Sequence, residues 1–288
     1  MIWLWSGAGR TAEDSLAQAR RQAEEYAQRS DEYRARPARP LSVEEAQAKK
    51  VIVEAAGILA EAESDERFGQ AASLYRQAVE IAPKYDAAWS GLGNAYFLQG
   101  LNLPLEGNSA KEKKLELYGR GKEACSKAQT LDPQSPAANL CLANLLLAEG
   151  EVKGVVASAW VLPEVFKLSD KVAAVDPYYD DGAIFRTFAV VLYIVPCWLA
   201  RSFGFAPEII LPYLDKAIER APDRFLNYSV RAGIYQKMGQ KEKALDDLGY
   251  MLSHDPAALP EFQRENRMQQ QKALRQWKDI SGRDYPGR

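Results

Sequence analysis

Histidine and cysteine are scarce in this sequence of 288 residues. The only histidine is His254, so metal sites built on several histidines and Ser-His or Cys-His catalytic pairs are hard to assemble. The three cysteines are far apart and show no CxxC spacing: Cys125, Cys141 and Cys197. We expect packed thiols on apolar helices rather than a disulfide framework or a zinc site.

The sequence also lacks an excess of one charge and a long apolar run. Its formal net charge of −2 argues against a nucleic-acid-binding protein, because such proteins carry a basic excess or stripe. The longest uncharged run, Thr187–Ala200, has about 14 residues, whereas a transmembrane helix needs roughly 20. The start, Met1–Trp5, is apolar but brief, and it lacks the basic residues of a signal peptide. We therefore expect no transmembrane span, and the compartment stays open.

Three kinds of catalytic motif are missing as well. The sequence has no paired carboxylates at a catalytic spacing, no glycine-rich phosphate loop and no metal-ligand spacing. We therefore expect a protein that is not an enzyme and that carries no cofactor. His254 precedes Asp255-Pro256 at the end of a predicted helix, where a cation suits the helix dipole, so we interpret it as a cap.

The clearest positive pattern is a pair of amphipathic segments within Ala71–Gly100. Apolar residues of the first segment recur at three- and four-residue steps, so they share one helix face. Pro83 ends that helix, because proline lacks an N–H and its ring clashes with the preceding turn. The second segment carries large and small residues in a fixed order: Trp89, Leu92, Gly93 and Tyr96. This order resembles the tetratricopeptide repeat (TPR), which implies antiparallel helical hairpins.

Further copies of the pattern follow along the chain. The copies, the first one included, are closed by prolines: Pro83, Pro133, Pro177, Pro222 and Pro256. We predict an all-α, TPR-like helical-hairpin solenoid of about five divergent repeats. The long spacing between copies predicts insertions at 101–116, 151–160 and 196–207, with a repeat helix that begins at Pro163. No strand pattern competes with the helices.

Two capping boxes, at Thr11–Asp14 and Ser42–Glu45, predict where the first two helices begin. The first helix runs to about Tyr33, and its alanine-rich face is expected to pack weakly or on a partner. Prolines in Arg34–Pro40 then forbid a continuous helix. We therefore divide the chain into an N-terminal helix with a linker, residues 1–40, and a repeat domain, residues 41–288.

The second half carries a more specific order of residues. Asp176–Gly182 (DPYYDDG) is followed by Arg186, by an apolar helix that ends at Pro196, and by a Lys-Ala helix that ends at Pro222. Three short blocks close the order: Leu259–Glu261, Glu265–Asn266 and Gln271–Ala273. Over roughly Asp176–Ala273 this resembles the TatT family, the TPR-containing periplasmic lipoproteins that accompany TRAP transporters.

The TatT resemblance implies a periplasmic homotrimer that contacts the extracytoplasmic solute-binding subunit of a transporter for carboxylates or hydrophobic ligands. The sequence departs from that family in two ways. No cysteine precedes Cys125, so the family's lipobox is missing, which leaves membrane anchoring open. The residues after Arg186 lack the glycine that the family often has there.

Asn94 and Asn144 occupy matching places on first helices of successive repeats. In a TPR array the first helices line the concave face, where an amide can bind an extended peptide backbone or a terminal carboxylate. The alternative is a solvated helix face. The lysines that accompany such asparagines in the carboxylate clamp of chaperone-binding TPR proteins are missing.

Arg186 and Arg231 also occupy matching places, within apolar surroundings. A buried guanidinium needs a carboxylate, which we expect from Asp180, Asp181 or a ligand anion. The third repeat has a surplus of aromatic residues that either line an apolar cavity or belong to the core: Tyr178, Tyr179, Phe185, Phe188, Tyr193 and Trp198.

The function we expect is that of a non-catalytic TPR scaffold of the TatT type. It would bind a partner protein, with a small apolar or anionic (carboxylate) ligand in addition. The alternative is a generic cytoplasmic TPR adaptor that binds a partner peptide in its concave groove.

Overall fold

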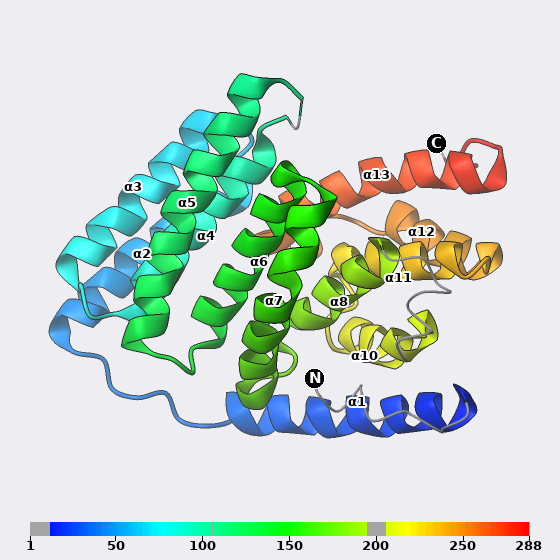
Figure 1. Cartoon of the computed structure of the whole chain (residues 1–288), viewed down its shortest axis with the longest axis horizontal. Coiled ribbons are helices and arrows are strands. Elements are labelled where there is room, and N and C mark those ends of the chain that lie inside the picture. Colours follow the sequence, from blue (N-terminus) through cyan, green and yellow to red (C-terminus); the bar gives the residue numbers. More distant parts are fainter. Residues whose placement is uncertain (1–11, 105, 195–205, 288) are drawn as a thin grey trace. The chain divides into compact units, whose positions relative to one another are not determined.

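The chain folds from helices alone wherever its structure is described. The structure is a computed structural model and describes residues 12–104, 106–194 and 206–287. Within these ranges it has twelve α-helices and no strand (Figure 1). The prediction of an all-α helical-hairpin fold is confirmed. In the same ranges, no helix combines the length and the apolar character that crossing a membrane requires.

The predicted proline stops coincide with observed helix ends. Five helices stop just before Pro83, Pro133, Pro177, Pro222 and Pro256, in that order: α3 (Asp65–Ile81), α5 (Asn108–Leu131), α7 (Val155–Val175), α10 (Leu211–Arg220) and α12 (Lys241–Ser253). The residue before a proline avoids the α conformation, so each proline sets a boundary that is independent of tertiary context.

The helices form two compact units. The central unit is Glu32–Asp176, and the split unit joins Met1–Asp31 to Pro177–Arg288. The predicted division at residue 40 does not coincide with this boundary, because the N-terminal helix belongs with the C-terminal helices.

The central unit contains α2 to α7. The helices not yet introduced are α2 (Val43–Glu61), α4 (Asp86–Asn102) and α6 (Pro136–Lys153). Each helix contacts the next one in the chain, and α4 also contacts α2 and α6. Contacts with the next helix and with the next but one are those expected where helical hairpins stack. The predicted capping box of Ser42 is present at the start of α2, with Glu45 as its partner.

Glycines let neighbouring helices approach α4 closely. A Cβ placed on Gly93 would lie 2.1 Å from Sγ of Cys125, and one on Gly100 would lie 2.3 Å from the ring of Tyr118. Both partners belong to α5, so the two glycines fix the distance between α4 and α5. The small residue in the order Trp89, Leu92, Gly93 and Tyr96 thus lies at a contact between two helices.

Two predicted insertions are helix rather than irregular chain. Residues 101–116 are largely taken up by the end of α4 and by the first turns of α5. Residues 151–160 belong to α6 and α7, which are separated only by Gly154. The helix predicted to begin at Pro163 begins at Val155 instead, with Pro163 inside it. The third predicted insertion, 196–207, lies almost wholly outside the described residues.

The split unit contains the remaining helices. These are α1 (Ala12–Arg34), α8 (Ala183–Ile194), α10, α11 (Phe225–Lys237), α12 and α13 (Gln263–Ser281), with short 3-10 turns at Tyr179–Asp181, Pro207–Ile210 and Pro260–Phe262. Helix α11 contacts α8, α10, α12 and α13, and so holds the unit together. The first predicted capping residue, Thr11, lies outside the described residues.

The alanine-rich face of α1 is covered by the chain itself. Ala19, Ala23 and Ala27 are buried. The Tyr213 hydroxyl on α10 donates a hydrogen bond of 2.6 Å to Oε1 of Gln22, so α1 is fastened to the split unit. The expectation that this face packs only weakly, or on another protein, is corrected.

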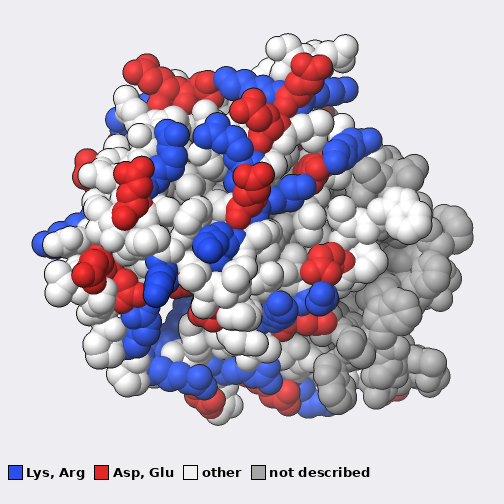
Figure 2. Space-filling view, turned by 60° about the vertical axis from the view of Figure 1, so that its left-hand side comes forward, with Lys and Arg blue, Asp and Glu red and all other residues white. Residues whose placement is uncertain are grey.

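The surface mixes both signs of charge. Figure 2 shows lysine and arginine side chains interspersed with aspartate and glutamate over the face that it presents. This agrees with the formal net charge of −2.

Candidate functional site

The first candidate surface lies on helices α4 and α6 of the central unit. Their relative direction follows from two pairs of contacts. Gly93 and Gly100 of α4 lie against Cys125 and Tyr118 of α5, so these two helices are antiparallel. Between α5 and α6, Gly121 lies against Leu145 and Cys125 is bonded to Cys141, so the order is reversed again. Helix α6 is therefore antiparallel to α5 and runs in the direction of α4.

Asn94 and Asn144 are carried on neighbouring turns of these two parallel helices. Sγ of Cys141 on α6 lies 3.9 Å from the carbonyl oxygen of Ser90 on α4. Asn94 follows Ser90 by one turn, and Asn144 follows Cys141 by one turn. The two amides are therefore carried by neighbouring turns of helices that contact each other, and the axes of packed helices are about 8–10 Å apart. Asn94 is exposed and Asn144 is half-buried.

Apolar side chains flank the two amides. Phe97 and Leu98 lie one turn after Asn94, and Leu147 lies one turn after Asn144. All three side chains are half-buried. We call these residues the amide face: Asn94, Phe97, Leu98, Asn144 and Leu147. An apolar surface with two amides can bury side chains of a peptide while both donating to and accepting from its backbone.

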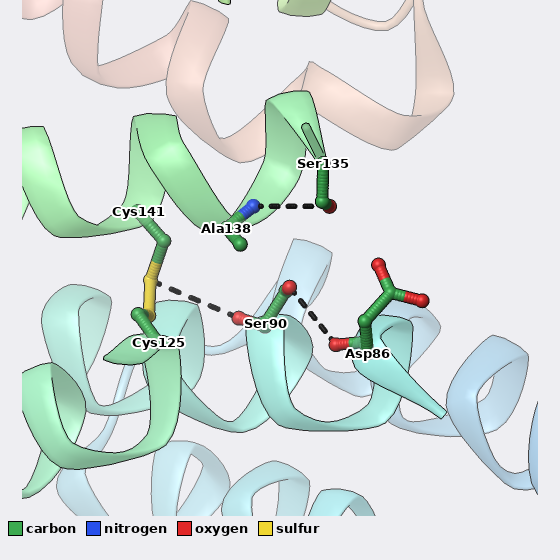
Figure 3. Close-up of a disulfide and its surroundings, with 6 residues drawn as sticks. All are labelled: Asp86, Ser90, Cys125, Ser135, Ala138 and Cys141. Atoms are coloured by element: carbon green, nitrogen blue, oxygen red, sulfur yellow. Dashed lines mark hydrogen bonds between the residues drawn. A yellow bond between two sulfur atoms is a disulfide. The ribbon is translucent and has the colours of Figure 1, made fainter. Parts of the chain in front are cut away.

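A disulfide lies beneath the amide face and was not predicted. Cys125 of α5 is bonded to Cys141 of α6, with the two Cα atoms 6.1 Å apart (Figure 3). Both residues are buried. The expectation that the cysteines are packed thiols is therefore wrong for this pair. A spacing of 16 residues along the chain is not a recognisable motif, and only the pairing of α5 with α6 brings the sulfurs together. Cys197 lies outside the described residues.

Two lysines of the central unit pair with a carboxylate of the unit itself. Lys122 and Lys153 both donate to Glu149, the latter at 2.5 Å. Burial acts to raise the pKa of Glu149, but the two hydrogen bonds outweigh it, so the pKa lies below its ordinary value. These lysines are satisfied within the fold and do not complete a clamp around the asparagines.

Arg186, in the split unit, is a buried cation with a full set of acceptors. Its guanidinium donates to the carboxylate of Asp180 at 2.6 Å, to the carbonyl oxygens of Asp180 and Asp181 at 2.8 and 2.9 Å, and to Oδ1 of Asn227 at 2.9 Å. Burial is the main influence on its pKa and lowers it, while the Asp180 charge opposes the shift. Of the three partners expected for Arg186, which were Asp180, Asp181 or a ligand anion, the structure has the carboxylate of Asp180.

The acceptors of Arg186 depend on a left-handed turn. Asp180, Asp181 and Gly182 have φ angles of 48°, 52° and 87°. Non-glycine residues in this region are uncommon and cost free energy unless their surroundings hold them. Here the turn directs two successive carbonyl oxygens at one guanidinium, so the ion pair and the turn stabilise each other.

Arg224 is a second buried cation, and sequence reasoning did not identify it. It donates to Glu265 at 2.7 Å and pairs with Asp180 at 3.2 Å and Asp181 at 3.4 Å. Its guanidinium also lies 3.3 Å from the ring centroid of Phe262. Burial disfavours its charge, but the carboxylates outweigh this and raise the pKa. Its carboxylate partners lie far from it along the chain, so no local pattern in the sequence marked it.

Arg231, on α11, is held by a separate pair of carboxylates. It donates two hydrogen bonds to Asp247, at 2.9 and 2.5 Å, and one to Asp215 at 2.7 Å. Burial acts to lower its pKa, but the two carboxylates raise it overall. As with Arg186, the guanidinium is occupied by groups of the protein.

The predicted aromatic residues are divided between the core and the undescribed part. Tyr178 and Phe188 are buried, and Tyr178 lies 4.9 Å from Phe185 between ring centroids. Tyr179 is half-buried. Trp198 lies outside the described residues. Of the two roles expected for these rings, lining a cavity or packing in the core, the buried ones have the second.

The predicted site residues therefore do not form one site. Asn94 and Asn144 lie on two contacting helices of the central unit. Arg186 and Tyr178–Tyr179 surround the left-handed turn in the split unit, and Arg231 belongs to its own ion-pair network. His254 is the C-cap of α12, as predicted, and its ring is stacked on that of Tyr250 at 3.8 Å. No cluster of three or more metal-ligating side chains occurs in the described part of the chain.

Comparison with known proteins adds no relative. No protein-family model matches the chain, and a search of curated proteins finds no match. The likeness to the TPR and TatT families therefore depends on the residues quoted above.

Proposed function

We propose that this protein is a non-catalytic helical-repeat scaffold that binds a partner protein through the amide face of its central unit. One observation carries the proposal. The exposed Asn94 and the half-buried Asn144 are presented on adjacent turns of two contacting helices, with half-buried apolar side chains beside them. The fold does not need an amide at either position.

The proposed binding mode joins apolar burial to backbone hydrogen bonding. Phe97, Leu98 and Leu147 would bury side chains of the partner, and the amides would fix the direction of its backbone. Each hydrogen bond would contribute about 1 kcal/mol, so the two amides together would change affinity by roughly ten- to thirtyfold. The helices beneath are packed, which keeps the surface rigid and lowers the cost of binding.

A protein partner is favoured over a small anionic ligand. Arg186 and Arg231, the residues expected to bind a carboxylate, already pair with Asp180 and Asp247. A ligand anion would have to displace these carboxylates. In line with the TatT resemblance, we propose the extracytoplasmic solute-binding subunit of a transporter as the partner, bound by a homotrimer of the chain.

Site-specific photocrosslinking in the native cells tests this proposal. A photoreactive amino acid at position 94 or 144 should form a covalent adduct with one protein, which mass spectrometry would identify. The matched control is position 127, because Lys127 is exposed on α5 away from the amide face. An adduct with a solute-binding subunit would support the TatT-like function, and one with a cytoplasmic protein would support the adaptor instead.

Binding and mass measurements complete the test. With the purified partner, Asn94→Ala combined with Asn144→Ala should weaken binding at least tenfold and leave the melting temperature unchanged. Equal crosslinking from positions 94 and 127, or unchanged affinity of the double variant, would exclude the amide face as the binding surface. A monomer in light scattering would count against the trimer.

A further inference from the structure

The buried disulfide carries information on the compartment in which the chain works. From its position we infer that Cys125 and Cys141 are oxidised when the protein is made, and that the amide face operates in an oxidising compartment. The inference does not depend on which partner binds, although it favours an extracytoplasmic partner over a cytoplasmic one.

The backbone geometry is suited to the bond. The Cα atoms of the two cysteines are 6.1 Å apart, inside the range of roughly 4.4–6.8 Å that disulfides occupy. The pair joins antiparallel neighbours in a hairpin, so no helix has to move for the bond to form.

The absence of a side chain at Gly93 on α4 leaves room for the sulfur atoms. A Cβ on residue 93 would lie 2.1 Å from Sγ of Cys125 and 3.0 Å from Sγ of Cys141. Gly93 has no such atom, so both sulfurs fit against the backbone of α4. The TPR-like glycine thus makes room for the cross-link.

Burial makes the bond resistant once it has formed. The exposed fraction is 0% for Cys125 and 7% for Cys141, so a reducing thiol cannot attack either sulfur while the helices are in place. Disulfides of this kind persist in extracytoplasmic compartments and are rare in the cytosol.

Formation of the bond is an ordinary exchange reaction. The two thiols lose two protons and two electrons as the S–S bond forms. The acceptor is the disulfide of a thiol oxidoreductase, which is reduced to a dithiol through a mixed-disulfide intermediate. Because both sulfurs are enclosed in the folded state, the exchange has to precede the closing of α4 over the hairpin.

Peptide mapping of the protein from its own cells tests the inference without any substitution. Cells are quenched in acid and alkylated with N-ethylmaleimide without a reductant, and the chain is digested with trypsin. Cleavage after Lys122, Lys127 and Lys153 places Cys125 and Cys141 in two adjacent peptides, 123–127 and 128–153. The expected result is one species with the two peptides linked and neither alkylated. Two separate alkylated peptides would overturn the inference.

A second measurement examines the cross-link in the purified chain. Unfolding and refolding with a reductant should lower the melting temperature by about 5–10 °C, as expected for a closed loop of this length. An unchanged melting temperature would show that the disulfide does not stabilise the α5–α6 hairpin. Linked peptides without a crosslinked adduct from position 94 would support the oxidising compartment and exclude the proposed binding surface. Separate alkylated peptides with such an adduct would exclude the oxidising compartment and support the binding surface.

Discussion

Replacement of Gly93 by alanine tests the packing on which both proposals depend. The added Cβ would lie 2.1 Å from Sγ of Cys125 and 3.0 Å from the carbonyl oxygen of Gly121. Neither neighbour is the free end of a flexible side chain, because one is a bonded sulfur and the other is helix backbone. The clash therefore has to be relieved by moving α4 away from α5.

The change in free energy of unfolding caused by Gly93→Ala is the difference between two opposing effects. Overpacking of a well-packed core costs about 1–3 kcal/mol, and the rigid neighbours place Gly93→Ala at the upper end. Alanine regains about 0.8–1 kcal/mol, because it is a better helix former than glycine. The net loss of free energy of unfolding should be about 2 kcal/mol.

Gly57→Ala is the matched control. Gly57 lies in α2 of the same unit, and a Cβ placed there would have nothing within 4 Å. This variant should gain up to about 1 kcal/mol from helix propensity alone. Urea unfolding followed by circular dichroism measures both, and the two variants should differ by about 3 kcal/mol.

The same substitution in a Cys125→Ala variant identifies the atom that causes the clash. With Cys125→Ala, the sulfur nearest to residue 93 is absent, so Gly93→Ala should cost much less than it does in the unaltered chain. If Gly93→Ala is as stable as Gly57→Ala, or costs the same with and without Cys125, the reasoning on the glycine vacancy is refuted.

Three further predictions concern charged and titratable groups. Arg231→Met should cost about 3–5 kcal/mol in urea unfolding, because it leaves the buried Asp247 unpaired, and adding Asp247→Leu should recover most of that loss. Burial raises the pKa of Tyr118 to about 12, so the tyrosine ionises in the unfolded chain before it does in the folded one. The free energy of unfolding should therefore fall between pH 10 and 12, and Tyr118→Phe should remove up to about 2.7 kcal/mol of that fall. Hydrogen bonds from Lys113 and Gln99 lower the pKa of Asp65 in the folded chain. Its contribution to stability is therefore complete above the pKa of the unfolded chain, about 4, and is lost as the pH falls through the pKa of the folded chain. Asp65→Asn should make the free energy of unfolding depend less on pH in acid. A variant with the pH profile of the unaltered chain would contradict the corresponding assignment.

The helices were predictable because their signals are local. A proline forbids the next helical turn whatever surrounds it, and apolar residues at three- and four-residue steps form a face in any helix. The insertions were predicted from the spacing alone, and spacing does not tell whether the extra residues form a loop or a longer helix. Pro163 was misread for a related reason, since a proline is tolerated inside a helix where packing holds the flanking turns.

The disulfide and the second arginine depend on tertiary structure, so no local signal specified them. Cys125 and Cys141 look like any two apolar helix residues until α5 is paired with α6. Arg224 is enclosed by Asp180, Asp181 and Glu265, which come from two distant stretches of the chain. Sequence reasoning on Arg186 succeeded because Asp180 is near it along the chain.

The left-handed turn explains why the split unit looked more like a ligand site than it is. An arginine in apolar surroundings beside two aspartates is a pattern shared by anion sites and by structural ion pairs. Two non-glycine residues with positive φ are tolerable only when the surrounding structure holds them, and here the Arg186 guanidinium donates hydrogen bonds to both of their carbonyl oxygens. A ligand that took this arginine would leave the turn without its support, so opening the site would cost the fold of the segment. The amide face has no such structural role, because Asn94 can be bound by a partner without breaking any interaction on which α4 depends. For that reason we propose the binding surface in the central unit.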